Sequence, residues 1–371
     1  MAENPRPALS VIVKCHNEEA KLGLCLSSIL VETAGTGAEI IVADAASEDR
    51  SLEIARAYPV RILRLADPGD RRCGATAHLG WQAARGDFIL LVDGDMELLP
   101  GFLGAALRAM AADPRLAAVG GHLVEMSDGL EFQERQKRAN PARAAGMVSH
   151  ITGCALYRRQ AVEDAGHFMD RNLHCYEEFE LGIRLRAKGW RLLRLDMPCV
   201  RHHGHRDAPL ALLRRRWRTR FLHGHGEILR AVWGKPYFLE ATKPCRLPAA
   251  VVGWWAVLMP LAVATPFAAW AGPALLLVVA LPPAALLARK RSLGRAAYAF
   301  ALWQLCAASL LAGLVGRRVA PTTPLPAIEF EGRAPPAAAV PHDDGRREKE
   351  DTLVVGGHPV RAAPAPEARR E

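Results

Sequence analysis

The sequence lacks closely spaced pairs of cysteines. Its 371 residues include eight Cys, and none of them forms a Cys-x-x-Cys pair. A structural zinc site or the disulfide framework of a small secreted protein is therefore not expected. We expect reduced thiols in a domain that faces the cytosol.

Two glycine-rich phosphate-binding motifs are also missing. No Gly-x-Gly-x-x-Gly follows the first predicted strand, and no Gly-x-x-x-x-Gly-Lys-Ser/Thr occurs anywhere in the chain. These absences argue against a dinucleotide-binding domain and against a P-loop protein. Hydrophobic residues make up 50% of the chain and charged residues 23%, so it can build a core, and its length predicts about two structural units.

Charge is absent from two long stretches near the C-terminus. Residues 249–288 and 296–316 contain no Asp, Glu, Lys or Arg, and a membrane span needs about 20 apolar residues. The first stretch has room for two spans, with a turn at 270–273. Its second half, 274–288, is short and holds Pro282-Pro283, so a kinked or re-entrant element is the alternative. We expect two or three spans within residues 246–318.

Positive charge is concentrated just before these stretches. Residues 184–246 hold sixteen Lys and Arg against four Asp and Glu, a net charge of +12, while the whole chain carries +9. Next to membrane spans, this predicts contact with anionic lipid rather than with nucleic acid. Together with Arg289-Lys290-Arg291, it predicts a multi-pass protein of the inner (plasma) membrane with a cytoplasmic N-terminal domain. Arg317-Arg318 favours the opposite side for the third stretch. No signal peptide is expected.

The N-terminal part alternates predicted strands and helices. Near-continuous apolar strands indicate an α/β fold with a mostly parallel sheet that is covered on both faces. In such sheets, ligands bind beyond the carboxyl ends of the strands. The predicted strands are 9–15, 39–43, 60–65, 88–92 and 116–120. The predicted helices are 18–30, 47–57, 74–84 and 100–112, and Ser47 is the expected N-cap of the second.

Polar residues follow three of these strands. His16-Asn17-Glu18 comes after the first, Asp44 after the second, and Asp93-Gly94-Asp95 after the fourth. All three sets fall at the same edge of the sheet. Two carboxylates one residue apart are costly unless a positive group joins them, and Mg²⁺ takes one or two carboxylates together with substrate phosphates. The alternative is that Asp93-Gly94 is only a turn.

Five segments together resemble the family 2 glycosyltransferases, which have the GT-A fold. The resemblance covers residues 9 to about 217. It implies a nucleotide-diphosphate sugar donor, a divalent cation (Mg²⁺ or Mn²⁺) and inversion at the anomeric carbon. The matching segments are Val-Ile-Val-Lys-Cys-His-Asn-Glu (11–18), Ile-Ile-Val-Ala-Asp-Ala-Ala-Ser-Glu-Asp (40–49), Ala-Arg-Gly-Asp-Phe-Ile-Leu-Leu-Val-Asp-Gly-Asp (84–95), Gly-Cys-Ala-Leu-Tyr-Arg-Arg (153–159) and Tyr-Glu-Glu-Phe-Glu-Leu-Gly-Ile-Arg-Leu (176–185).

The resemblance also implies roles for residues of the donor site. Asp44 would contact the base of the donor, although Ala45 stands where the family usually has a second Asp. Asp93 would face the ribose and sugar side, and Asp93 and Asp95 would bind the metal. Arg71, or its neighbour Arg72, falls in a loop that faces the nucleotide; a solvated pair is the alternative. His16, Asn17, Glu18 and Gly94 complete the predicted donor-binding set.

Two further motifs carry the predicted chemistry of the acceptor side. Glu177-Glu178-Phe179-Glu180-Leu181 corresponds to the family's Glu-Asp-x-x-Leu, whose second acid is the general base, here Glu178; Glu177 and Glu180 are the alternatives. A general base must be ionised and close to the hydroxyl that it deprotonates. His202-His203-Gly204-His205 lies where a family His can complete the metal site, and we favour His203. A zinc or surface cluster is the alternative.

Arg214-Arg215-Arg216-Trp217 resembles the Gln-x-x-Arg-Trp motif of processive polysaccharide synthases, but Leu213 occupies the Gln position. The segment also fits a basic helix on lipid headgroups. We therefore predict a catalytic GT-A domain at 1–245, with 209–245 on the membrane surface, and a disordered tail at 319–371. The predicted function is transfer of one sugar to a lipid-linked or glycan acceptor of the cell envelope. A processive synthase and a non-catalytic membrane scaffold are the alternatives.

Overall fold

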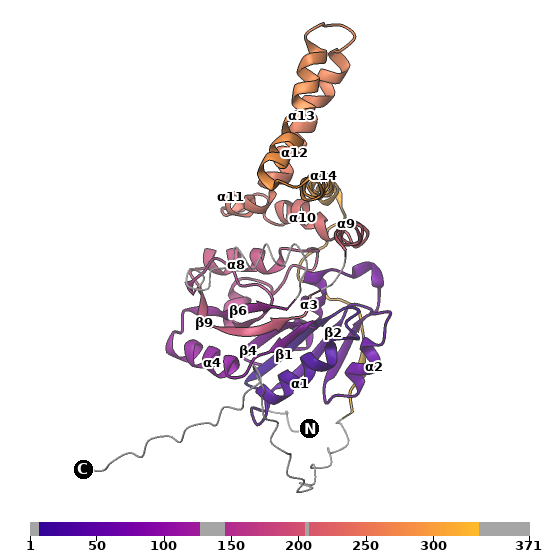
Figure 1. The fold of residues 1–371 in the computed structure, drawn as a ribbon. Helices are drawn as coiled ribbons and strands as arrows, with labels where there is room; N and C mark the ends of the chain where they lie inside the picture. Colours follow the sequence, from indigo (N-terminus) through magenta and orange to yellow (C-terminus); the bar gives the residue numbers. More distant parts are fainter. Residues whose placement is uncertain (1–6, 127–144, 205–207, 334–371) are drawn as a thin grey trace, which may run out of the picture. The chain divides into compact units, whose positions relative to one another are not determined.

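The computed structural model describes residues 7–126, 145–204 and 208–333 (Figure 1). An α/β domain comes first along the chain, and a group of apolar helices follows it. In the part described, the strands form one sheet in the order β10-β3-β2-β1-β4-β8-β6-β9-β5, with β7 paired to β9. The strands are β1 Leu9–Cys15, β2 Glu39–Asp44, β3 Arg61–Leu65, β4 Phe88–Asp93, β5 Met96–Leu98, β6 Leu116–Glu125, β7 Gly146–Met147, β8 Ala155–Arg158, β9 Arg191–His202 and β10 Ala327–Glu331.

The parallel half of the sheet has apolar side chains on both faces. Val11 and Val13 of β1 pack toward helices α1, α2 and α4, whereas Ile12 packs toward α3. Gly80 lets α3 approach closely, because a Cβ atom there would lie 2.3 Å from the Ile12 side chain. Both faces are therefore covered, as the apolar strands predict. The helices of this domain are α1 Leu22–Glu32, α2 Ser51–Arg56, α3 Cys73–Ala83, α4 Phe102–Ala112, α7 Arg159–Asp164 and α8 Glu177–Ala187.

The α/β prediction is confirmed, but the sheet is less parallel than expected. β1, β2, β3 and β4 run parallel, and β6 is parallel to β9. In contrast, β8 is antiparallel to both β4 and β6, and β5 and β7 are antiparallel to β9. α2 begins at Ser51 rather than after Ser47. The strands of the antiparallel half of the sheet have weaker apolar runs in the sequence, so the way they pair was not predictable from strand patterns.

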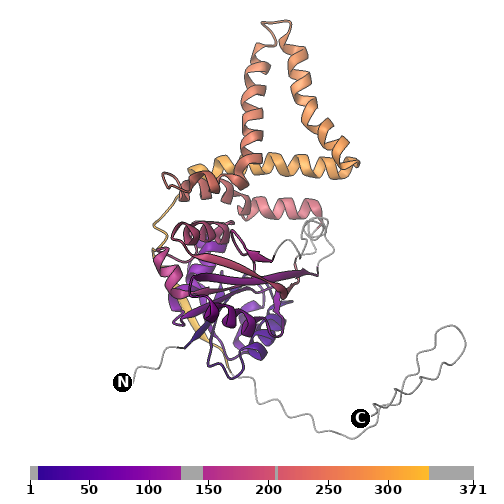
Figure 2. The same ribbon diagram turned by 90° about the vertical axis from the view of Figure 1, so that its left-hand side faces the viewer.

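Amphipathic and apolar helices follow the α/β domain (Figure 2). Three stretches are long and apolar enough to cross a membrane: Phe238–Ala264, Ala271–Lys290 and Leu293–Val315. Pro282-Pro283 does not break the second, which is one helix of 20 residues. The helices are α9 Pro209–Arg218, α10 Gly224–Ala231, α11 Phe238–Ala241, α12 Arg246–Ala264, α13 Ala271–Lys290 and α14 Leu293–Val315.

The chain returns to the α/β domain after α14. β10 adds to the edge of the sheet, antiparallel to β3, and Arg56 stacks over the Phe330 ring at 4.4 Å. The expected disorder from residue 319 is therefore wrong for 319–333; the rest of the tail, 334–371, lies outside the described residues. The reason is that Ala327–Glu331 pairs with β3, whose outer edge would otherwise be unpaired. The composition of the tail did not predict this pairing.

Candidate active site

The predicted site residues meet at the carboxyl ends of three adjacent strands. β1 lies between β2 and β4, and the register pairs Cys15 with Asp44 and Lys14 with Asp93. Gly94 follows directly, and its N–H donates to the Lys14 carbonyl at 2.7 Å. A Cβ at this position would lie 3.0 Å from the same carbonyl oxygen. The order of the parallel strands thus brings Asp44, Asp93 and the end of β1 together, as expected.

Lys14 lies between two acids of this site, a position that was not predicted from the sequence. Its side chain is 11% exposed, and its Nζ lies 2.8 Å from Asp93 Oδ1 and 3.3 Å from Glu177 Oε1. Burial opposes the charged form, but Asp93, Glu177 and Glu178 outweigh it and raise the pKa of Lys14 well above its usual value. The chain thereby supplies one cation of its own to this acidic site.

Asp44 lies at the end of β2 and is engaged within the protein. It is 1% exposed, accepts hydrogen bonds from the Ser47 hydroxyl and, at 3.1 Å, from the Ser47 N–H, and lies 3.6 Å from Arg64 Nε. Ser47 is therefore not the N-cap of α2. The Asp44 carboxylate holds the loop after β2 in place, and its contact with the base of the donor stays a prediction.

Arg71 holds the same loop from the other side. Its guanidinium donates to the carbonyls of Ala45 at 3.0 Å and Ala46 at 2.9 Å. His16 lies nearby: burial and Arg71 lower the pKa of this His, and its buried Nδ1 has no hydrogen-bond partner within the described residues. Arg71 and His16 thus lie close together beside the ends of β1 and β2, and their contact with the donor stays a prediction.

Asn17 completes this edge. It adopts a left-handed backbone (φ 56) that Asn tolerates, and its side-chain oxygen accepts the Glu48 N–H at 2.8 Å. Its own N–H donates to the Ser47 hydroxyl at 3.0 Å. The segments that follow β1 and β2 are therefore joined by hydrogen bonds.

Asp95 lies against His202, not against the predicted His203. His202 Nε2 is 3.2 Å from Asp95 Oδ2, and its Nδ1 is 2.8 Å from Glu125 Oε2. The His203 ring instead points to Glu97 at 3.4 Å. Successive side chains of an extended strand point to opposite sides, and β9 ends at His202, which explains the difference. His205 lies outside the described residues.

The surroundings of Asp95 have some, but not all, of the features of a site for a divalent cation. Burial and the Asp95 carboxylate raise the pKa of Glu18 to about 7, although Lys21, whose Nζ lies 3.3 Å from Glu18 Oε2, acts to lower it. Crowded carboxylates of this kind are what an oxygen-seeking cation relieves. However, among residues 7–126, 145–204 and 208–333, no group of three or more His, Cys, Asp or Glu side chains is already arranged to hold a metal ion. Asp95 and Glu18 fit a cation that also takes ligands from a substrate.

The three acids of α8 have different partners. Glu180 is 2% exposed and pairs with Arg184 Nε at 2.7 Å. Glu177 faces Lys14. Glu178 is half-buried and accepts the Gly153 N–H at 2.8 Å. Burial raises the pKa of Glu178 to about 8, while Lys14 acts to lower it. Glu178 is therefore the acid of this helix whose environment is suited to gaining and losing a proton.

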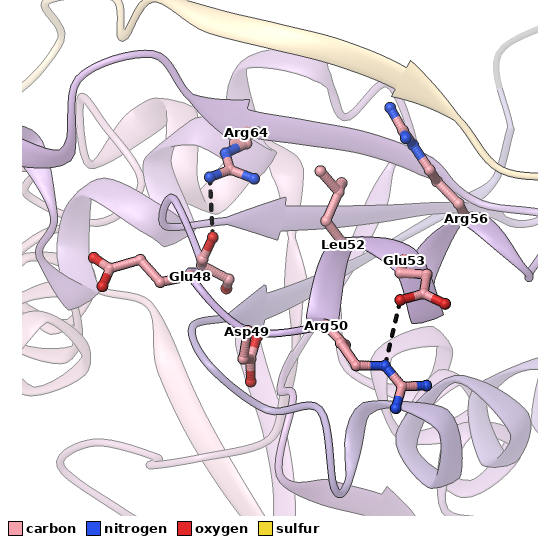
Figure 3. Close-up of a pocket in the computed structure, with 8 residues that line it drawn as sticks. Glu48, Asp49, Arg50, Leu52, Glu53, Arg56 and Arg64 are labelled. Carbon is pink, nitrogen blue, oxygen red and sulfur yellow. Dashed lines mark hydrogen bonds and ion pairs between the residues drawn. The ribbon is translucent and has the colours of Figure 1, made fainter.

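A cavity of about 610 Å³ borders the loop that Asp44 holds (Figure 3). Arg64 donates to the Ser47 carbonyl at 2.9 Å, and Arg50 pairs with Glu53 at 3.3 Å. None of Asp93, Asp95 or Glu178 lines this cavity. The cavity lies beside the loop after β2 and is not lined by the acids proposed for catalysis and metal binding. Its lining is Ser47, Glu48, Asp49, Arg50, Leu52, Glu53, Arg56 and Arg64.

The fold and the acids at its strand ends define a glycosyltransferase of the GT-A type. The chain belongs to glycosyl transferase family 2, whose profile matches residues 10–166. MT1568 of Mycobacterium tuberculosis, an uncharacterised protein, is 30% identical over 49% of this chain and 68% of its own length. Undecaprenyl-phosphate 4-deoxy-4-formamido-L-arabinose transferase of Pseudomonas aeruginosa is 29% identical over 44% of this chain. The chain spans half (50%) of that relative's length.

A solved structure supports the fold. The mannosyltransferase PcManGT from Pyrobaculum calidifontis, in complex with GDP-Man and Mn²⁺, superposes with a TM-score of 0.53. The match covers 83% of this chain and 88% of that one, at 21% sequence identity. This likeness extends the GT-A assignment beyond the residues that the family profile matches.

Proposed function

We propose that this chain transfers a sugar, with inversion, from a nucleotide-diphosphate donor to a hydroxyl group of a lipid-linked or cell-envelope acceptor. The observation that carries the proposal is the environment of Glu178. Its side chain is half-buried, accepts a hydrogen bond from the Gly153 N–H, and lies within the electrostatic influence of the Lys14–Asp93 ion pair. In this reaction Glu178 takes the proton of the acceptor hydroxyl as that oxygen attacks the anomeric carbon. The Gly153 N–H fixes the orientation of the carboxylate.

The chain's own residues divide the remaining work. Arg71, His16 and Asn17 form the wall of the donor site, and Lys14 offsets the charge of Asp93 and Glu177. Asp95, with Glu18 and His202 beside it, would hold Mg²⁺ or Mn²⁺. When bound, this cation would offset the negative charge that develops on the departing diphosphate.

The acceptor proposal rests on the apolar helices and on one relative. Three stretches are suited to a membrane, and the name of the Pseudomonas aeruginosa relative contains a polyprenyl phosphate. The basic helix α9 precedes them with Arg214, Arg215, Arg216 and Arg218, which fits the headgroups of a cytoplasmic leaflet. We therefore propose an inner-membrane protein with its catalytic domain in the cytoplasm. Leu213 in place of the Gln of the processive motif favours transfer of a single sugar.

A screen of nucleotide sugars with the full chain in detergent tests the donor and the metal together. We expect turnover of at least one UDP- or GDP-sugar with Mn²⁺ or Mg²⁺ and its loss in EDTA. Asp95→Asn should weaken activation by Mn²⁺ at least tenfold, because it removes a charge from the proposed metal site. Asp196→Asn, which changes an exposed Asp on β9, is the control. Full activity in EDTA would refute metal dependence.

The pH dependence of kcat/KM tests the proposed base. Below its pKa of about 8, Glu178 is protonated and unable to accept a proton. We therefore expect kcat/KM to fall about tenfold per pH unit below that value and to level off above it. A rate constant independent of pH between 6 and 9 would contradict the assignment of Glu178.

A further inference from the structure

Both ends of the apolar helical region are bound to the same α/β domain. On the N-terminal side, Glu240 of α11 pairs with Arg186 of α8 at 2.6 Å. On the C-terminal side, Arg318 pairs with Asp170 at 2.5 Å. The Val319 N–H and carbonyl both bond to the Asn172 side chain at 2.9 Å. β10 then extends the sheet itself.

These contacts restrict the number of membrane crossings. A folded α/β domain lies on one side of a bilayer, so a chain that leaves it at residue 246 and rejoins it at residue 318 crosses an even number of times. Three crossings would place Arg318 and β10 on the side opposite to Asp170 and β3, against their direct contacts. Three apolar helices therefore cannot all be spans.

The hairpin formed by α12 and α13 shows which two helices form the pair. α12 has 19 residues and α13 has 20, which at 1.5 Å per residue gives about 28 to 30 Å each, close to the hydrocarbon thickness. They form a hairpin, in which the Trp254 indole N–H donates to the Val278 carbonyl at 2.9 Å. This hairpin returns the chain to its starting side before α14 begins.

α14 runs across the hairpin instead of alongside it (Figure 2). Its Gln304 accepts the Trp255 indole N–H at 2.7 Å. Its last turns pack on α10: a Cβ on Gly313 would lie 2.2 Å from the His223 carbonyl, and one on Gly226 would lie 2.1 Å from the Leu310 carbonyl. α10 is in turn bound to the catalytic side by Glu227, which lies 2.7 Å from His174.

We propose that only the α12–α13 hairpin crosses the membrane, and that α14 lies along the membrane surface on the catalytic side, with lipid as its partner. Large apolar side chains of α14 are exposed, Leu293 at 75% and Val315 at 85%. Basic residues flank both ends, Arg289-Lys290-Arg291 and Arg317-Arg318, as expected when both ends stay on the cytoplasmic side. The inference rests on the proposed membrane attachment and is independent of the proposed reaction.

Labelling of single cysteines with a membrane-impermeant maleimide tests this topology. The full chain with Cys73 and Cys306 replaced by Ala is the parent and gives the background, since the other six cysteines are buried. Leu293→Cys and Val315→Cys should label in inverted vesicles, where the catalytic side faces outward. Phe267→Cys, in the hairpin turn and 85% exposed, should label only in right-side-out vesicles. All three positions lie outside the proposed active site.

The contrary outcomes are distinct. Labelling of Val315→Cys from the side opposite to Leu293→Cys would mean that α14 crosses, and labelling of all three from one side would mean that nothing crosses; either result overturns the proposal. Release of the protein by alkaline carbonate would overturn the attachment itself. A fluorescent protein and a periplasm-dependent phosphatase, each fused after Glu371, give a second readout: fluorescence without phosphatase activity is expected. None of these measurements uses sugar transfer, so an inactive enzyme does not affect them.

Discussion

Glu178→Gln is expected to lower kcat by about 10²- to 10⁴-fold, the usual contribution of a positioned general base, and to leave the affinity for the donor unchanged. The amide keeps the size of the side chain and can still accept the Gly153 N–H, but it cannot take a proton. Single-turnover rates and donor binding measured by calorimetry, at saturating Mn²⁺, separate the two effects. A variant that loses donor binding as well would place Glu178 in the donor site instead.

Glu180→Gln is the matched control for this variant. Glu180 lies two residues away on α8, but it is buried and pairs with Arg184. Its loss should lower thermal stability, because Arg184 is left buried without its partner, while kcat of the folded enzyme changes by less than about threefold. If Glu180→Gln abolishes turnover and Glu178→Gln does not, the assignment of the base on α8 is wrong.

The sequence predicted the half of the fold whose elements carry strong local signals. The five predicted strands and four predicted helices up to residue 120 are present, although α2 begins at Ser51 and the short strand β5 was not predicted. Buried parallel strands form apolar runs in the sequence, and the helices between them show apolar residues at helical spacing. β10 was missed for a physical reason: its pairing with β3 joins residues more than 260 positions apart, and its surroundings in the sequence are rich in Pro. The docking of the chain after α14 depends on such contacts and leaves little local trace.

The site was predictable in its location but not in its pairings. Strand ends at one edge follow from topology, so the sequence predicted that Asp44 and Asp93 lie at neighbouring strand ends. Whether a carboxylate is already engaged depends on residues elsewhere, such as Arg64 for Asp44 and Lys14 for Asp93. The choice between His202 and His203 required knowing where β9 ends. A Lys at the end of an otherwise apolar strand was the signal for Lys14.

Lys14→Met should have the second large effect, because it leaves Asp93 and Glu177 without the cation between them. Removing one partner of a buried ion pair typically costs about 3–5 kcal/mol, and Lys14 is only 11% exposed. Lys14 also acts to lower the pKa of Glu178, so its loss should raise that pKa above 8. We expect a lower unfolding temperature and, in the folded enzyme, a pH profile of kcat/KM that moves toward alkaline pH.

Two further variants separate charge from packing in this prediction. Lys14→Arg keeps the positive charge and should keep the midpoint of the pH profile, although its wider fork fits the site less well. Lys14→Met combined with Glu177→Gln removes one charge of each sign, so the unfolding temperature should recover partly toward that of the parent, since fewer carboxylates remain crowded. An additive loss of stability in the double variant, together with an unmoved pH midpoint in Lys14→Met, would show that Lys14 fills space and does not set the electrostatics of the site. Recovery of the unfolding temperature in the double variant, together with an alkaline shift of the pH midpoint in Lys14→Met, would show that Lys14 acts as a permanent cation beside the proposed base. The metal proposed at Asp95 would then add a second positive charge to the site.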